Sequence, residues 1–90
     1  MKEVIKALQR VKEIVENYQM DLSYSTYKSK EELVNNLELY ISKLKVNDFS
    51  LNIEISLLFA PTGDLQEIAI DNGWSEEYME LAEIIDLMIM

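Results

Sequence analysis

The sequence predicts an all-α protein, a compact single domain of about five short helices that spans residues 1–90. Apolar residues recur at three- and four-residue steps in most of the chain, and residues that cap helices stand where those steps begin. No long linker, repeat or low-complexity tract divides the chain, which favours one domain. The alternative is an α+β fold, in which a hairpin at residues 51–70 packs on helices.

The first segment, residues 2–18, has the spacing of an amphipathic helix. Charged residues separate its apolar positions, which are Val4, Ile5, Leu8, Val11, Val15 and Tyr18. Residues 21–27 are rich in serine and tyrosine, and serine hydroxyls compete for backbone hydrogen bonds. We expect a loop there, in which Tyr24 and Tyr27 either lie against the domain or offer contact area to a partner.

A second helix is predicted for residues 30–45. Ser29 and Glu32 have the spacing of a capping box, in which the serine side chain accepts a hydrogen bond at the start of the helix. One stripe of apolar residues follows: Leu33, Val34, Leu37, Tyr40, Ile41 and Leu44. Residues 47–50 end the helix.

Residues 51–60 are ambiguous, and they decide the fold class. Apolar residues at every second position indicate a strand: Leu51, Ile53, Ile55 and Leu57. A helical stripe behind a cap at Ser50 is equally present: Leu51, Ile55, Leu58 and Phe59. The favoured interpretation is helical, and the strand interpretation stays open.

Residues 61–73 begin with a turn at Pro61, after which the chain returns either as a second strand or as a helix. In the helical interpretation Thr62 is the cap and Asp64 lies in the first turn, where a carboxylate is favourable. Gly73 then ends the helix in the left-handed conformation.

The last helix is predicted to start at a cap formed by Ser75, with Glu76 and Glu77 in its first turn. Its apolar stripe is Tyr78, Leu81, Ala82, Ile85, Met88 and Ile89. On the other side Glu76, Glu80 and Glu83 follow one another at helical spacing, and we call these three residues the acidic ridge. The ridge is either a solvated face or a site for a basic partner.

The net charge of −9 is distributed unevenly along the chain. Residues 1–45 hold all eight basic side chains and seven acidic ones, whereas residues 46–90 hold ten acidic side chains and no basic one. Such a field repels phosphate and attracts basic surfaces, although acidity also keeps small proteins soluble. The charge therefore predicts a basic protein partner and no nucleic-acid partner.

Cysteine and histidine are both absent, which removes disulfides, thiolate chemistry, the usual zinc ligands and the commonest general base. The carboxylates follow no EF-hand pattern, and no phosphate-binding loop is present. We expect no catalysis, no cofactor and no bound metal. No apolar run is long enough to span a bilayer and the N-terminus is unlike a signal peptide, so we expect a cytoplasmic protein without a membrane partner.

Trp74 stands between the Asn72-Gly73 pair and the last helix, at a chain reversal. One interpretation is structural, with the indole packed onto Met79 as a hydrophobic staple. The other is functional, with Trp74 and Tyr78 as an aromatic anchor for a partner, because buried aromatic residues dominate many interfaces.

Residues 65–85 also have the outline of a helix-turn-helix motif, two helices around a glycine turn. The second helix, however, begins Ser75-Glu76-Glu77 and carries no Lys, Arg, Asn or Gln that could contact phosphates or bases. The charge of this segment argues against DNA binding.

Four segments resemble a family of small uncharacterised bacterial proteins: FAPTG at residues 59–63, LQEI at 65–68, NGW at 72–74 and EYMELA at 77–82. Members of this family look like candidate immunity proteins, which neutralise a toxin made by the same or a neighbouring cell. The resemblance covers about residues 57–86 and implies no catalytic or binding residues. It is consistent with an acidic inhibitor of a basic toxin.

The leading hypothesis is a small acidic binding protein that inhibits a basic partner with its C-terminal half. The predicted partner-binding residues are Trp74, Glu76, Glu77, Tyr78, Glu80 and Glu83. Phe59 and the loop tyrosines are further candidates for contact. The alternative is a non-catalytic structural or regulatory module of a phage or mobile element, which forms a homodimer through the apolar residues 87–90.

Overall fold

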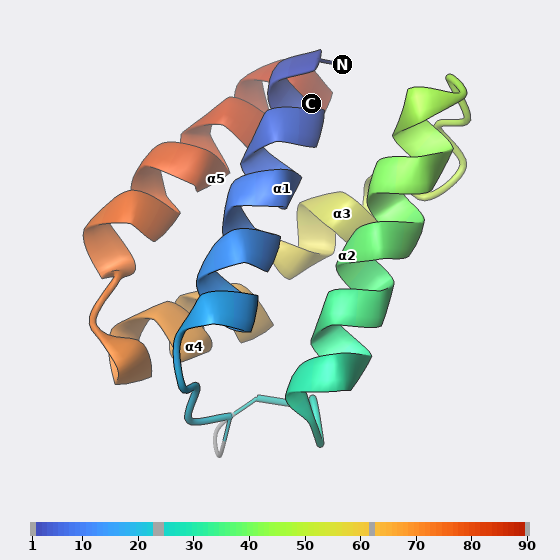
Figure 1. The fold of residues 1–90 in the computed structure, drawn as a ribbon. Coiled ribbons are helices and arrows are strands. Elements are labelled where there is room, and N and C mark those ends of the chain that lie inside the picture. The colour runs from blue at the N-terminus through green and yellow to red at the C-terminus, as the bar shows by residue number, and fades with distance from the viewer. Residues whose placement is uncertain (1, 23–24, 62, 90) are drawn as a thin grey trace.

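The computed structural model describes residues 2–22, 25–61 and 63–89, and within them it contains five α-helices and no β-strand (Figure 1). The helices are α1 (Lys2–Asn17), α2 (Lys30–Lys45), α3 (Asn52–Leu58), α4 (Asp64–Asn72) and α5 (Ser75–Ile89). The predicted all-α class is confirmed. The hairpin alternative is wrong, because residues 51–70 form α3 and most of α4.

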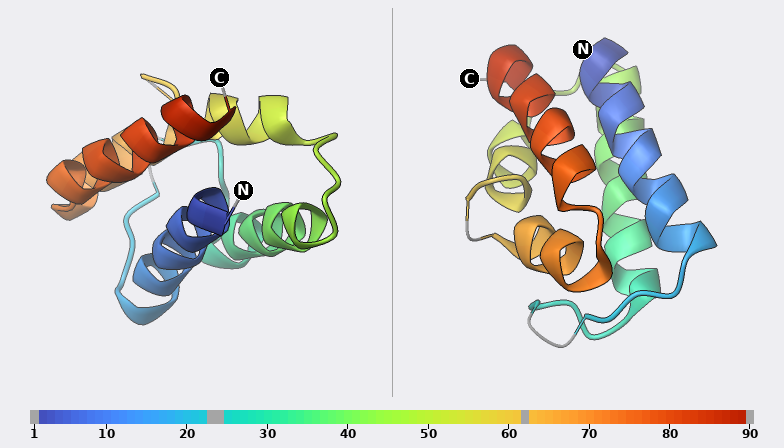
Figure 2. Two further views of the ribbon diagram at one scale, coloured as in Figure 1. Left: turned by 90° about the horizontal axis from the view of Figure 1, so that it is seen from above. Right: turned by 90° about the vertical axis from the view of Figure 1, so that its left-hand side faces the viewer.

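The five helices form two layers, which are seen edge-on in the view from above (Figure 2). One layer is the antiparallel pair of α1 and α2, and the other contains α3, α4 and α5. Helix α5 joins the layers, because it packs against α1 as well as against α3 and α4. The Cα radius of gyration is 12.0 Å, close to the roughly 12 Å expected for a compact chain of this length.

The core lies between the layers and follows the predicted apolar stripes. Its largest side chains without solvent exposure come from all five helices and from the residue after α3: Val4, Leu8, Val11, Val15, Leu33, Leu37, Ile55, Phe59, Leu65, Ile68 and Ile85. Among the described residues no polar or charged side chain is buried. Tyr18 departs from its predicted place in the stripe, because α1 ends at Asn17 and the tyrosine is exposed.

Helix α2 begins and ends where the sequence predicts. The Ser29 hydroxyl accepts a hydrogen bond from the backbone N–H of Glu32, at 3.2 Å, so the predicted cap is confirmed. After Val46 the chain turns at Asn47, which adopts the left-handed conformation with φ of 59°. Asparagine tolerates this conformation better than most side chains do, and α2 cannot continue through it.

The predicted caps of α3 and α5 are wrong by one residue each. Leu51 occupies the N-cap position of α3 without a capping side chain, while the backbone N–H of Ser50 donates to Asp48. Ser75 is the first residue of α5, and the carbonyl of Trp74 accepts the bond from the N–H of Tyr78. Ser50 and Ser75 therefore indicated where α3 and α5 begin to within one residue, although neither is the N-cap residue.

Glycines flank helix α4 on both sides, Gly63 before its first residue and Gly73 after its last. The predicted cap Thr62 lies outside the described residues, and Gly63 occupies the N-cap position. A Cβ atom on Gly63 would stand 2.9 Å from the carbonyl oxygens of Leu57 and Ala60, so the tight α3–α4 connection requires glycine. Asp64 lies in the first turn and Gly73 adopts a φ of 82°, both as predicted.

Candidate functional site

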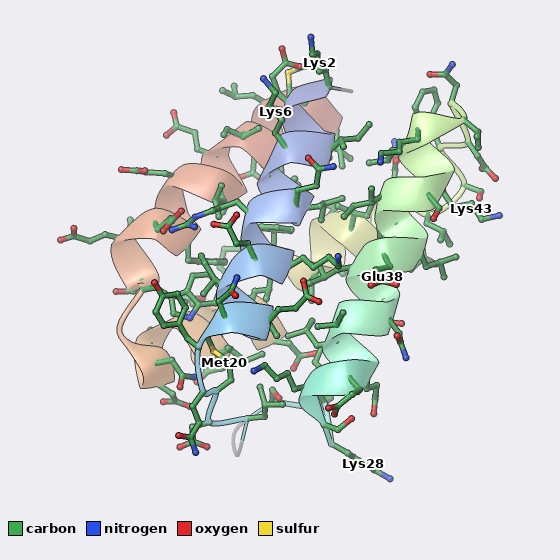
Figure 3. The ribbon with its side chains drawn as sticks, viewed as in Figure 1. Lys2, Lys6, Met20, Lys28, Glu38 and Lys43 are labelled. Carbon is green, nitrogen blue, oxygen red and sulfur yellow. The ribbon has the colours of Figure 1, made fainter. Side chains whose placement is uncertain are left out.

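The uneven charge of the sequence becomes a separation of charge between the two layers. All eight basic residues belong to α1, α2 and the loop between them, as the labels on Lys2, Lys6, Lys28 and Lys43 illustrate (Figure 3). The layer of α3, α4 and α5, which we call the α3–α5 layer, contains no basic residue. This layer is therefore the candidate site for a basic partner.

Six acidic side chains of the α3–α5 layer are exposed: Glu54, Asp71, Glu76, Glu80, Glu83 and Asp86. In the described part of the chain none of the six forms an ion pair, because the ion pairs there involve other carboxylates. Their charge is therefore not neutralised within the molecule, and it produces a negative potential over the layer.

The acidic ridge is exposed on α5, as its helical spacing predicts. Exposed apolar side chains accompany it along α5: Met79, next to Glu80, is 67% exposed, and Leu87, one turn after Glu83, is 75% exposed. Trp74, for which a staple onto Met79 is one predicted role, is partly buried and packs against the core. A surface that mixes carboxylates with exposed aliphatic side chains can both attract a basic partner and bury area against it.

Glu77 differs from its ridge neighbours because it is paired within the molecule. The Arg10 guanidinium donates to both carboxylate oxygens of Glu77, from Nε at 2.5 Å and from Nη2 at 3.1 Å, and also pairs with Glu13. Hydrogen bonds from Arg10 lower the pKa of Glu77 and keep its carboxylate ionised. Glu77 therefore joins α5 to α1, an interaction between residues 67 positions apart that the sequence does not reveal.

Tyr78 lies inside the molecule, with 5% of its surface exposed. Its hydroxyl donates to the backbone carbonyl of Phe59 at 2.7 Å, and the two rings stack with centroids 6.5 Å apart. Burial, with a contribution from the Asp86 charge, raises the pKa of Tyr78. Tyr78 and Phe59 thus fix α5 to the end of α3, and both residues are buried.

Trp74 is half-buried at the corner between α4 and α5. It borders a surface cavity of about 400 Å³, whose other walls include Ile14 of α1 and Tyr18 and Met20, which follow that helix. The indole nitrogen is buried and donates to no described residue. The exposed part of the Trp74 side chain therefore does not include its N–H group. It consists of carbon atoms, which offer apolar contact at the edge of the α3–α5 layer.

Two pairs of polar interactions tie the loop after α1 to the ends of α4. Asp64 accepts hydrogen bonds from the N–H and the hydroxyl of Thr26, at 3.0 and 2.6 Å. At the other end Asn72 accepts from the N–H of Asp21 at 2.8 Å and donates to its carbonyl at 2.9 Å. In the sequence, these interactions are indicated only by the short polar side chains of Asp64 and Asn72 at the two ends of α4, a residue type that often bonds to nearby backbone.

The loop tyrosines do not form an exposed pair in the described residues. Tyr24 lies outside them, and Tyr27 is buried with its hydroxyl accepting a hydrogen bond from the Asn36 side chain at 3.2 Å. Burial raises the pKa of Tyr27. Tyr27 therefore supports the loop from within the core.

No group of three acidic side chains in the described residues is placed to hold a metal ion. No helix in this part of the chain is both long and apolar enough to pass through a lipid bilayer. Comparison of the chain with protein-family models, with curated proteins and with solved structures finds no match. The resemblance to candidate immunity proteins thus stays a prediction.

Proposed function

We propose that this chain is a cytoplasmic binding protein, without catalytic activity, that inhibits a basic protein partner by covering it with the α3–α5 layer. One observation carries the proposal: this layer exposes six carboxylates that lack ion pairs in the described residues, and it contains no basic residue. A toxin of the same or a neighbouring cell is the partner that the resemblance to immunity proteins favours.

The charge and the apolar side chains of the layer have separate roles in this proposal. Its negative potential accelerates the encounter with a basic surface and disfavours acidic competitors. Burial of Ile70, Met79 and Leu87, all exposed in the free chain, then slows dissociation. A nuclease toxin suits this arrangement, since an enzyme that binds phosphate needs a positive active site.

The residue composition of α5 argues against a DNA-binding role for the helix-turn-helix outline of α4, Gly73 and α5. Helix α5 is the element that would enter the major groove, and it contains neither a basic residue nor Asn or Gln. Its exposed carboxylates repel the phosphate backbone. We therefore propose a protein partner for this surface.

Capture from an extract of the source organism at low salt tests the proposal. The wild-type chain is compared with a variant in which Glu76, Glu80 and Glu83 are replaced by lysine. A matched control changes three exposed acids of the other layer, Glu3, Glu31 and Glu32, to lysine, so the net charge changes equally.

We expect the wild type and the control to retain a basic protein that the ridge variant does not retain. The purified partner should lose its own activity when the wild-type chain is added. Retention of the same proteins by all three chains would contradict the proposal, as would a partner whose activity the bound chain leaves unchanged.

A second candidate function, self-association, has one observation in its favour. Leu87 and Met88 near the end of α5 are exposed, although Ile89 packs against the core and Met90 lies outside the described residues. Light scattering of the concentrated protein separates the two candidates. A dimer that Leu87→Gln converts to a monomer would favour self-association, and a monomer at every concentration would contradict it.

A further inference from the structure

A shallow groove lies between α3 and the C-terminal end of α5, away from the residues that the sequence predicts for binding. It measures about 310 Å³ and is lined by Asn52, Ile53, Ser56, Leu57 and Ile89. Ile53 and Leu57 are 73% and 64% exposed, although both are large aliphatic residues. The groove is therefore a surface feature with a largely aliphatic lining.

The exposed residues of the groove are separate from the core face of α3. Ile55 and Leu58 on the same helix are buried, so α3 already has the apolar contacts that hold it to the domain. Ile53 and Leu57 are one helical turn apart and form a second stripe on the outer side. Single exposed aliphatic residues are common on proteins, but two that meet a third from α5 in one groove indicate a docking surface.

Both helices carry an exposed carboxylate close in sequence to the lining residues, although neither carboxylate belongs to the lining itself. Glu54 follows Ile53 directly and is exposed, and on α5 the exposed Asp86 precedes Ile89 by one turn. Neither helix carries a basic residue; Lys2 and Lys6, which Figure 3 shows at the same end of the molecule as the end of α5, belong to α1. An occupant of the groove therefore meets apolar contact in the lining, and the charged residues that α3 and α5 themselves expose near it are acidic.

This charge selects among the possible occupants. In a symmetric contact between two copies the Glu54 and Asp86 side chains would gather at one interface, where like charges disfavour association. An acidic segment of a partner meets the same repulsion. A basic segment with an apolar stripe satisfies both features, because its aliphatic side chains fill the groove while its lysines or arginines reach the carboxylates.

We propose that the groove formed by Ile53, Leu57 and Ile89 binds a cationic amphipathic segment of a protein partner, in helical form. The partner places apolar side chains at i and i+3 or i+4 in the groove, and basic side chains beside Glu54 and Asp86. The inference rests on the proposed function, since it adds a specific docking site to the basic partner that the α3–α5 layer is proposed to bind.

Two synthetic peptides of roughly 18 residues, long enough for appreciable helix formation, test the proposal. Both contain the same leucines, alanines and lysines, but only one arranges its leucines on one helical face. Titration calorimetry measures the binding of each peptide to the full chain at low salt. We expect the amphipathic peptide to bind about tenfold or more tightly than the scrambled one, because only the former buries a continuous apolar stripe.

Two variants separate the groove from general attraction. Ile53→Gln with Leu57→Gln is expected to weaken binding of the amphipathic peptide by about tenfold or more. The matched control Leu39→Gln with Val46→Gln changes two exposed apolar residues of α2 and its end, and it should leave the affinity unchanged. All four positions are exposed, and circular dichroism verifies that each variant keeps its helix content.

Equal affinity for both peptides, or for the groove variant and the wild type, would overturn the proposed docking site. Self-association of the wild type that the groove variant abolishes would overturn it too, and would assign the groove to a second copy. If the captured basic partner needs the acidic ridge but neither Ile53 nor Leu57, the proposed function stands and the groove proposal fails. If the partner needs none of these residues, both proposals fail.

Discussion

The two glycines show how differently one residue type can be required. Gly63 is surrounded by backbone, with carbonyl oxygens where a side chain would begin, whereas Gly73 has open space around it but a φ of 82°. The first glycine is needed for room and the second for its backbone conformation.

Substitution by alanine should distinguish these roles in urea unfolding. Gly63→Ala is expected to lower the free energy of unfolding by about 1–3 kcal/mol, because backbone atoms must move. Gly73→Ala should cost about 1–2 kcal/mol through the left-handed conformation alone, and Gly73→Asn less than that. An alanine at residue 63 without effect would contradict the close approach of the α3–α4 connection.

The Tyr78 hydroxyl is the second residue-scale feature that stability measurements can test. Tyr78→Phe leaves the ring stacked on Phe59 but removes the hydrogen bond to its carbonyl, so we expect a loss of about 1–3 kcal/mol. Tyr18→Phe is the matched control, because Tyr18 is exposed. Equal stability of both variants in chemical unfolding would show that the buried bond does not hold α5 in place.

At the scale of elements, Asp48 stabilises the turn between α2 and α3. Hydrogen bonds from the hydroxyl and the N–H of Ser50, and then from Lys43, lower the pKa of Asp48 to about 2. Because this pKa is lower in the folded chain, the ionised carboxylate stabilises the fold above the unfolded pKa of about 4. This contribution is lost as the pH falls through the folded value.

Asp48→Asn is therefore expected to lower the melting temperature at pH 7. The difference from the wild type should shrink between pH 4 and about pH 2. Thermal unfolding of both proteins across this range measures the effect. A difference that stays constant down to pH 2 would mean that the charge of Asp48 is not responsible.

The ties between α4 and the loop after α1 predict two local effects. Asn72→Ala should increase amide hydrogen exchange at Asp21, and Asp64→Ala should increase it at Thr26, because each variant removes the acceptor of that N–H. Each variant serves as the control for the other. Exchange that rises at both amides in both variants would indicate general unfolding of the loop instead of two independent ties.

The helices could be predicted from sequence where periodicity and burial agree. In α1, α2 and α5 the apolar stripe is the face that packs, apart from the exposed Tyr18 and Met88 near helix ends, so spacing alone identified these helices. In α3 the outward Ile53 and Leu57 produced the false strand pattern, because they are apolar but do not belong to the core. The ambiguity of this segment thus marked an unusual surface, as conflicts between pattern and fold often do.

At the scale of the whole molecule, the separation of charge between the layers followed from the sequence, because the basic residues end at Lys45. The exposure of Glu76, Glu80 and Glu83 followed from helical spacing. The apolar stripe already placed Tyr78 toward the core, but the hydrogen bonds of Glu77 and Tyr78 did not follow, since their partners Arg10 and Phe59 are distant in sequence.

In the proposed function, the α3–α5 layer is the binding face of this small protein. Each exposed carboxylate of the α3–α5 layer adds little alone, but six that form no ion pair in the described residues produce a field that extends about a Debye length into solution, near 10 Å at 0.1 M salt. The apolar residues of the layer act only at contact. Charge should therefore determine the rate of association, and apolar burial the lifetime of the complex.

The most direct test is the association rate of the chain with its captured basic partner, measured by stopped flow at low and high salt. We predict that the wild-type rate falls steeply with salt. At low salt, the variant with lysine at Glu76, Glu80 and Glu83 should associate about tenfold or more slowly. Equal rates for the two proteins at low salt would contradict the claim that the acidic α3–α5 layer meets the partner.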